Sequence, residues 1–113
     1  MDARKKLGNR GEDQAANWYK AAGYEILARN WRCELGEIDL ICRVEDVLVI
    51  SEVKSRSNVR YGTPIEAVTR SKCHRLRRLA IRWLATQNTY FDSIRFDVVC
   101  ILNDQIEVIE GAF

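Results

Sequence analysis

The sequence has little of what a zinc protein or a disulfide-bonded protein needs. It contains a single histidine, His74, and its four cysteines form no C-x-x-C motif. Because structural zinc sites are built from clustered cysteine and histidine ligands, we expect no zinc site. Cys42 and Cys100 lie inside apolar, strand-like runs. This placement is typical of buried free thiols in a reducing compartment.

Long hydrophobic runs are also missing. The longest apolar runs are about as long as a strand, far short of the ~20 residues that a membrane-spanning helix needs. The segment Met1–Lys6 turns polar at once, so no signal-peptide core follows the early charges. With 47% hydrophobic and 30% charged residues, the composition is that of a globular protein. We expect one domain over residues 1–113, located in the cytoplasm and not in a membrane.

Acidic residues are absent from one long stretch, although the whole chain is nearly balanced in charge. The net charge is only +2, too small to indicate a nucleic-acid partner by itself. No Asp or Glu lies between Glu66 and Asp92. A charge run is usually a solubilising helix face, but such faces normally mix both signs, so we favour binding to a phosphate backbone. The candidate backbone-binding residues are Arg70, Lys72, Arg75, Arg78 and Arg82.

The spacing of apolar residues predicts two helices and five strands. Apolar residues three and four apart predict helices over Gly8–Ala22 and Ile65–Thr86. An irregular segment, Ser55–Pro64, holds the only proline and precedes the second helix. The order is helix, three strands, helix, two strands, which indicates an α/β protein. Runs rich in Ile, Leu and Val predict the strands Tyr24–Trp31, Leu35–Val44, Val47–Lys54, Ile94–Leu102 and Gln105–Ile109.

Two carboxylates, those of Asp39 and Glu52, are predicted to face each other across two neighbouring strands. If residues 45–46 form a two-residue hairpin turn, counting outward from it places Asp39 opposite Glu52. Directly opposed residues have Cβ atoms about 4.5–5.5 Å apart, and like charges at that range destabilise a sheet. A fold tolerates the pair if a divalent cation lies between them or if one carboxylate is protonated. A bulge or a longer turn would break this register.

The same register places Glu37 opposite Lys54. Carboxylate oxygens with several retained waters are what Mg²⁺ prefers, and Lys54 would orient an attacking water or stabilise developing negative charge. The alternative is an ordinary ladder of cross-strand ion pairs, which contributes little to stability. Both strands are apolar on both faces up to these positions. Charges confined to one end of such strands are as typical of an active site at the edge of the sheet as of a ladder of cross-strand ion pairs.

Glu12 is a further acidic candidate, because it lies on the apolar side of the first predicted helix. It shares the helix face of Ala15, Ala16 and Tyr19. The alternative is a glutamate that is favoured by the helix dipole in the first turn, an effect of about 0.3–1 kcal/mol. The spacing alone favours this alternative.

Several short motifs, in order along nearly the whole chain, resemble the YraN family. These are small bacterial proteins predicted to be endonucleases, similar to the archaeal Holliday junction resolvases and to the PD-(D/E)xK superfamily. Each motif is weak alone, whereas the ordered set is specific. The matching segments are Gly11-Glu12, Gly23-Tyr24-Glu25-Ile26-Leu27, Asn30-Trp31-Arg32, Gly36-Glu37-Ile38-Asp39-Leu40-Ile41, Glu52-Val53-Lys54-Ser55-Arg56, Gly62-Thr63-Pro64, Glu66-Ala67-Val68 and Phe96-Asp97-Val98-Val99.

The resemblance implies a restriction-endonuclease-like fold, with an αβββαβ core and a mixed central sheet flanked by helices. It implies that Asp39 and Glu52 bind Mg²⁺ or Mn²⁺ with the help of the Val53 carbonyl. Glu37 and Arg56 are expected to support this site. The implied catalytic residues are Glu12, Asp39, Glu52 and Lys54.

Together these patterns predict a metal-dependent endonuclease that hydrolyses phosphodiester bonds in DNA, at branched or damaged structures. A chain with one metal site needs a second copy to cut two strands, which favours a homodimer. The alternative is a nucleic-acid-binding accessory protein of the same fold without turnover. A third option is a domain that binds a partner protein through the predicted helix Ile65–Thr86.

Overall fold

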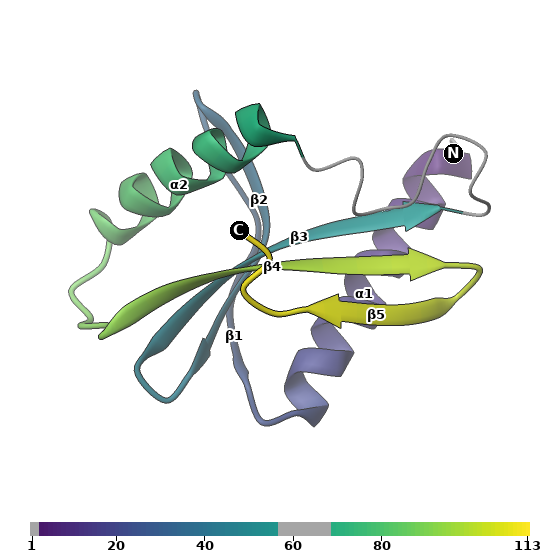
Figure 1. Ribbon diagram of the computed structural model, residues 1–113, viewed down its shortest axis with the longest axis horizontal. Coiled ribbons are helices and arrows are strands. Elements are labelled where there is room, and N and C mark those ends of the chain that lie inside the picture. The colour runs from purple at the N-terminus through teal and green to yellow at the C-terminus, as the bar shows by residue number, and fades with distance from the viewer. Residues whose placement is uncertain (1–2, 57–68) are drawn as a thin grey trace.

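The structure is a computed structural model that describes residues 3–56 and 69–113 (Figure 1). Its elements form one five-stranded sheet with the order β1-β2-β3-β4-β5. Strands β3 and β4 are parallel and the other neighbours are antiparallel, so the sheet is mixed. In the described part of the chain, no helix is long and apolar enough to cross a membrane. The elements are α1 (Ala3–Ala21), β1 (Glu25–Cys33), β2 (Gly36–Val44), β3 (Val47–Arg56), α2 (Arg70–Leu84), β4 (Ser93–Leu102) and β5 (Gln105–Ile109).

The predicted α/β class and order of elements are confirmed, whereas some predicted bounds are wrong. Helix α1 begins at Ala3 instead of Gly8, because the residues before Gly8 are mostly good helix formers. Helix α2 begins at Arg70, since Thr69 has an extended backbone and its hydroxyl accepts a hydrogen bond from the Lys72 N–H. Strand β3 continues to Arg56. The remaining predicted bounds at residues 57–64 and 65–68 lie outside the described residues.

The two helices pack on opposite faces of the sheet, and each covers its own hydrophobic cluster (Figure 1). Helix α2 is amphipathic: Leu76, Leu79, Ala80 and Trp83, three and four positions apart, face inward, whereas Ile81 is exposed. Because both faces of the central strands are covered, β2 and β3 are apolar on both sides. The cluster below α2 includes Leu76, Leu79, Trp83, Ile38, Ile41, Ile50 and Phe96, and the cluster below α1 includes Ala15, Ala16, Tyr19, Leu40, Cys42, Val49 and Val99.

The alternation of side chains along β2 breaks at Asp39. Ile38 packs in the cluster below α2, whereas Leu40, two residues on, packs in the cluster below α1. In a regular strand, residues two apart point to the same face. Opposite this point in β1, Asn30 has a left-handed backbone with φ of 53°. The two strands therefore bend together, and the Asp39 side chain leaves the regular pleat at the bend.

A buried polar network fixes α1 to the middle of the sheet. The Tyr19 hydroxyl lies 3.0 Å from Ser51 Oγ and 2.8 Å from Asp97 Oδ2, and all three residues are fully buried. Asp97 also accepts two hydrogen bonds from the Arg95 guanidinium and one from the Gly111 N–H. Burial raises the pKa of Tyr19, so its hydroxyl stays protonated. The network holds α1 against β3 and β4.

Candidate metal and catalytic site

Three carboxylates converge where α1 meets the beginning of β2. Glu12 of α1 and Glu37 and Asp39 of β2 each offer one oxygen, and these oxygens lie within 4.8 Å of one another. All three residues are partly buried. Glu12 is more than 20 residues from Glu37 and Asp39 in sequence, so the fold brings these carboxylates together. Its geometry would allow it to bind a cation, because hard oxygen ligands from several carboxylates are what divalent cations such as Mg²⁺ take.

Gly11 allows α1 to come close enough to β3 for Glu12 to reach this cluster. The glycine is buried, and a Cβ atom built on it would overlap with Ser55 Oγ and lie 3.3 Å from Ser55 Cβ. Ser55 Oγ is itself buried, and within the described residues it has no hydrogen-bond partner. A glycine inside a helix costs roughly 0.5–1 kcal/mol relative to alanine. Here the glycine allows a close approach between helix and strand.

Asp39 is held by the neighbouring strand. The predicted hairpin register is confirmed from Val44↔Val47 to Leu40↔Ser51, where the pairing of the two strands ends. Beyond it, Asp39 Oδ2 accepts a hydrogen bond of 2.8 Å from the Val53 N–H. The Asp39 side chain thus accepts a hydrogen bond from the backbone of β3. This bond places the Val53 N–H beside the acidic cluster.

The charge state of Asp39 is perturbed more than that of an ordinary surface carboxylate. Burial, the Glu52 carboxylate and the Glu12 carboxylate raise the pKa of Asp39 to about 7, while the Val53 N–H and Lys54 act in the opposite direction. The charge of Glu52 thus acts on Asp39, although Glu52 is not one of the three carboxylates whose oxygens lie within 4.8 Å of one another. Crowded carboxylates of this kind are common at functional sites.

Glu52 and Lys54 form an ion pair beside the cluster. Lys54 Nζ lies 2.9 Å from Glu52 Oε1, and their side chains are only 18% and 13% exposed. Burial would lower the pKa of Lys54, but the attraction of Glu52 outweighs it and leaves that pKa raised. The predicted pairing of Glu37 with Lys54 lies beyond the paired part of the hairpin, which ends at Leu40↔Ser51; on its other side, Glu37 forms an ion pair of 2.7 Å with Arg32 of β1. The bend at Asp39 breaks the register on which that prediction depended.

Lys72 of α2 adds a further positive charge near the Glu52–Lys54 pair. Its ammonium group interacts electrostatically with Lys54, Glu52 and Arg75. Burial and the neighbouring Lys54 lower the pKa of Lys72. Helix α2 therefore adds a positive charge that acts on Glu52 and Lys54 of β3.

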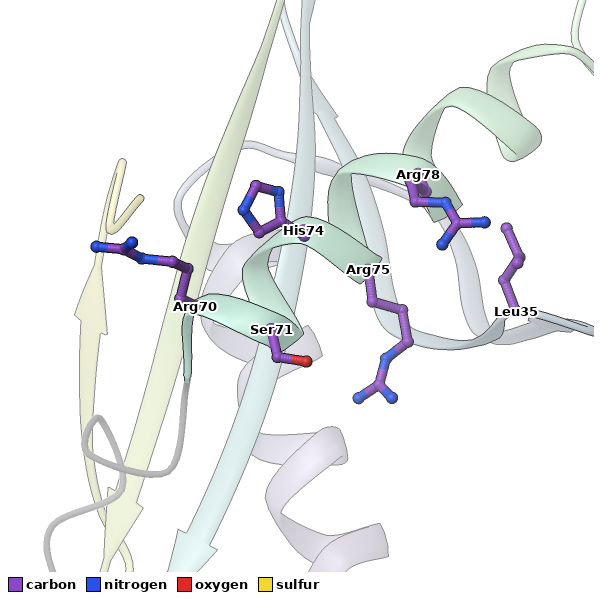
Figure 2. A pocket seen from close by; sticks show the side chains of 6 residues that line it. All are labelled: Leu35, Arg70, Ser71, His74, Arg75 and Arg78. Atoms are coloured by element: carbon purple, nitrogen blue, oxygen red, sulfur yellow. The ribbon is translucent and has the colours of Figure 1, made fainter.

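The basic face of α2 borders an open groove of about 670 Å³ beside this site. Figure 2 shows Arg75 and Arg78 on the side of the helix that faces Leu35, with Arg70 reaching away on the other side. Within residues 10–56 and 69–113, the only α2 cation with a carboxylate partner is Arg82, which pairs with Glu34. Arg82 is thus engaged with the turn between β1 and β2. The groove is lined by Leu35, Arg70, Ser71, His74, Arg75 and Arg78.

Two of the sequence-predicted site residues, Arg56 and Arg82, make contacts outside the acidic cluster. Arg56 donates a hydrogen bond of 2.9 Å to the Ser55 carbonyl and lies near the end of β3. Sequence reasoning gave Glu37 only a supporting place and did not detect Arg32 as its partner, because their pairing depends on the β1–β2 register. It also did not single out the buried Asp97, although a lone acid inside an apolar run was a usable signal. Five predicted residues make up the site: Glu12, Glu37 and Asp39 form the carboxylate cluster, and Glu52 and Lys54 form an ion pair.

A family model described as "Uncharacterised protein family UPF0102" matches residues 11–101. The chain belongs to the UPF0102 family. The match begins at Gly11 and includes all five converging residues of the site.

Several UPF0102 proteins are similar over almost their full lengths. The protein from Rhodococcus opacus is 48% identical over 112 residues, which cover 95% of either chain. The protein from Beutenbergia cavernae is 49% identical over 102 residues, with 90% of this chain and 86% of its own covered. That from Frankia casuarinae is 47% identical over the whole of both chains. The site described above therefore lies within a unit that these UPF0102 proteins share.

Proposed function

We propose that this UPF0102 protein is a metal-dependent endonuclease that hydrolyses phosphodiester bonds in DNA. The observation that carries the proposal is the convergence of Glu12, Glu37 and Asp39 beside the Glu52–Lys54 ion pair. Acidic ligands next to a lysine, at the end of a helix-covered mixed sheet, are the arrangement implied by the resemblance to the YraN family and the PD-(D/E)xK superfamily. We expect a restriction-endonuclease-like arrangement of this kind to hydrolyse phosphodiester bonds.

The donor set fits Mg²⁺ or Mn²⁺. It is made of carboxylates, with no histidine or cysteine among the converging residues, and hard cations select such oxygen ligands. Asp39 and Glu52 would hold the ion, with the Val53 carbonyl as a further ligand, and Glu12 and Glu37 would complete the acidic pocket. When bound, such an ion stabilises charge on a phosphodiester and lowers the pKa of an attacking water.

Side chains of the protein supply the chemistry that the metal ion does not. Glu52 holds the Lys54 ammonium at 2.9 Å, so this lysine is pre-positioned and remains charged. A fixed ammonium in a partly buried site stabilises negative charge that develops on a phosphoryl oxygen without reorganising at the moment of reaction. Lys54 would therefore act as the electrostatic catalyst, and the acidic pocket would orient the nucleophilic water.

The basic groove supports a nucleic-acid substrate. Arg70, Arg75 and Arg78 line it next to the site, and such cations bind a phosphate backbone without reading its sequence. Recognition without sequence readout suits DNA distinguished by its shape, such as branched or damaged DNA. We propose that two copies act together, since the described residues of one chain offer one acidic site. All four cysteines are free, which suits the reducing cytoplasm.

The test is cleavage of labelled four-way junction, flap, duplex, single-stranded DNA and RNA in Mn²⁺, Mg²⁺ or EDTA. Glu52→Gln and Lys54→Met are purified in parallel, with Glu107→Gln as the matched control, because Glu107 is an exposed glutamate in the edge strand β5. We expect metal-dependent cleavage of DNA by the wild type and the control. Loss of at least about 100-fold in rate is expected in the two site variants.

Two results would contradict the proposal. Cleavage that persists in both site variants would indicate a contaminating nuclease. DNA binding without cleavage under every metal condition, unchanged by Glu52→Gln, would leave a nucleic-acid-binding accessory protein without turnover. In that case the cations of α2 would explain the binding.

A further inference from the structure

A second pocket, of about 410 Å³, lies between α2 and the C-terminal residues. Four of its residues belong to α2 and are spaced three and four positions apart, so they share one face of the helix. Arg70 and His74 also line the groove described above, and Figure 2 shows Arg70 extending away from Arg75. We call this second cavity the Phe113 pocket. It is lined by Arg70, Cys73, His74, Arg77 and Phe113.

Phe113 forms an aromatic wall that the fold holds in place. Its ring stacks on that of Phe96 in β4, with centroids 5.2 Å apart and planes inclined by 28°. The residues before it are tied to β4: the Ala112 N–H donates a hydrogen bond of 2.8 Å to the Phe96 carbonyl, and the Gly111 N–H donates one of 3.0 Å to the Asp97 carboxylate. Phe96 is buried, whereas Phe113 is only partly buried. The pocket therefore has a fixed aromatic surface on one side.

Arg77 adds a planar cation to this wall. Its Cζ lies 5.1 Å from the centroid of the Phe96 ring and 6.0 Å from that of the Phe113 ring, which is the range of a cation–π contact. The residue is exposed, so a ligand can reach its guanidinium. Guanidinium planes and aromatic rings are both surfaces on which nucleic-acid bases stack.

The alternative is that these side chains only cover the hydrophobic cluster below α2. Phe96 belongs to that cluster and Phe113 packs against it. Packing does not account for Arg70 and His74, which line the same pocket and are exposed. Within residues 10–56 and 69–113, neither Arg70 nor Arg77 forms an ion pair with a carboxylate. An aromatic wall beside such cations is complementary to a ligand that combines a flat ring with a negative charge.

We propose that the Phe113 pocket binds one unpaired nucleotide of a nucleic-acid strand. The base stacks on Phe113 and Arg77. The phosphate binds Arg70 and His74, which the pocket shares with the groove beside the acidic site. In a duplex the faces of the bases are covered by their neighbours, so only a base that has left the stack offers its face to such a wall. This inference rests on the proposed function for nucleic acid as the partner, and it adds a preference for substrates with unpaired nucleotides.

The test is equilibrium binding in EDTA, which needs no turnover. One probe is a DNA duplex with a short single-stranded tail that carries fluorescent aminopurine. The other has a tail of the same length without bases, so both probes carry the same phosphates. We expect the tail with bases to bind about fivefold or more tightly, because stacking on an aromatic side chain strengthens binding by at least this factor. We also expect its fluorescence to be quenched. Equal affinities for the two probes would overturn the inference.

Substitutions in the pocket separate stacking from charge. Phe113→Leu keeps an apolar side chain and should abolish the preference for the tail with bases, whereas Phe113→Tyr should retain it. Arg77→Gln, at an exposed position, should reduce the preference without changing the ring. Arg78→Gln is the matched control, since this exposed arginine lines the groove but not the pocket. It should weaken the binding of both probes by the same factor. A preference that persists in both Phe113→Leu and Arg77→Gln would overturn the inference.

Competition with deoxyadenosine monophosphate distinguishes a strand from a free nucleotide. We expect the mononucleotide to displace the tail only at millimolar concentration. Displacement at micromolar concentration would assign the pocket to a free nucleotide and overturn the inference. Because binding is measured without metal, a protein that cleaves no DNA would contradict the proposed function and leave this test valid. Cleavage by a protein with no preference for the tail with bases would contradict the present inference alone.

Discussion

Asp39 accepts a hydrogen bond from the Val53 N–H across the ends of β2 and β3, at 2.8 Å. This is a backbone donor that a neighbouring strand would ordinarily occupy. The side chain therefore closes the hairpin where the regular pairing stops at Leu40↔Ser51. One carboxylate thus serves both the fold and the acidic site. Its charge is tied to the stability of the protein.

The first prediction is that stability falls as the pH rises from about 4 to 7 in the absence of metal. The pKa of Asp39 is raised from 3.8 to about 7 in the folded protein. The folded state therefore holds the proton over a range in which the unfolded state has released it, and this contribution is lost as the pH rises through 7. Asp39→Asn keeps an acceptor for the Val53 N–H without the charge. At pH 8 we expect it to raise the free energy of unfolding by roughly 1–3 kcal/mol.

Urea unfolding in EDTA between pH 4.5 and 8 measures this effect. Asp13→Asn is the matched control, because its carboxylate is 63% exposed in a surface pair with Arg29 and such pairs contribute about 0–1 kcal/mol. The wild type and the control should lose stability over this range, and Asp39→Asn should lose less. Parallel curves for all three proteins would contradict the assignment of the raised pKa to Asp39.

The second prediction concerns the response to metal. Because a cation relieves the repulsion among Glu12, Glu37 and Asp39, binding to the folded state alone should stabilise it. At millimolar Mn²⁺ we expect the Tm of the wild type to rise by about 5 °C or more. Glu12→Gln and Glu37→Gln should each reduce this rise, whereas Glu25→Gln, at the exposed start of β1, should not. An equal rise in all four proteins would indicate binding elsewhere.

The third prediction is that Tyr19→Phe destabilises the protein by about 1–3 kcal/mol. The substitution leaves Ser51 Oγ without the tyrosine hydroxyl and removes one of the partners of the buried Asp97. Urea unfolding of Tyr19→Phe, Ser51→Ala and the double variant measures the coupling between the two residues. Since they share one hydrogen bond, the double variant should cost less than the sum of the single ones. Additive costs would contradict a shared network.

Local patterns were sufficient to predict the hairpin of β2 and β3. A two-residue turn between two apolar runs sets the register from Val44↔Val47 onward, because strand periodicity is exact over a few residues. The same logic failed beyond Leu40. The bend there depends on β1, where Asn30 adopts a left-handed backbone, and a pattern within β2 and β3 carries no information about a third strand.

The candidate site was predictable in its residue types and less so in its pairings. Asp39 and Glu52 could be placed near each other because they lie on adjacent strands. Glu12 could be assigned to the site only by resemblance, since its position depends on how closely α1 approaches the sheet. The placement of Lys72 depends on α2 beginning at Arg70, after the extended residue Thr69, whereas the predicted helix ran through Thr69 without a break.

The fourth prediction tests the close approach of α1 that brings Glu12 to the site. In the wild type, Gly11→Ala should lower the free energy of unfolding by about 1–2 kcal/mol, because the new Cβ overlaps with Ser55 Oγ. In a Ser55→Ala background this overlap is removed, leaving a contact of 3.3 Å with Cβ of residue 55. There the helix propensity of alanine, worth up to about 1 kcal/mol over glycine, should make Gly11→Ala neutral or stabilising. Urea unfolding of the four proteins measures the change of sign. An equal cost of Gly11→Ala in both backgrounds would show that the packing of α1 against β3 does not depend on this contact.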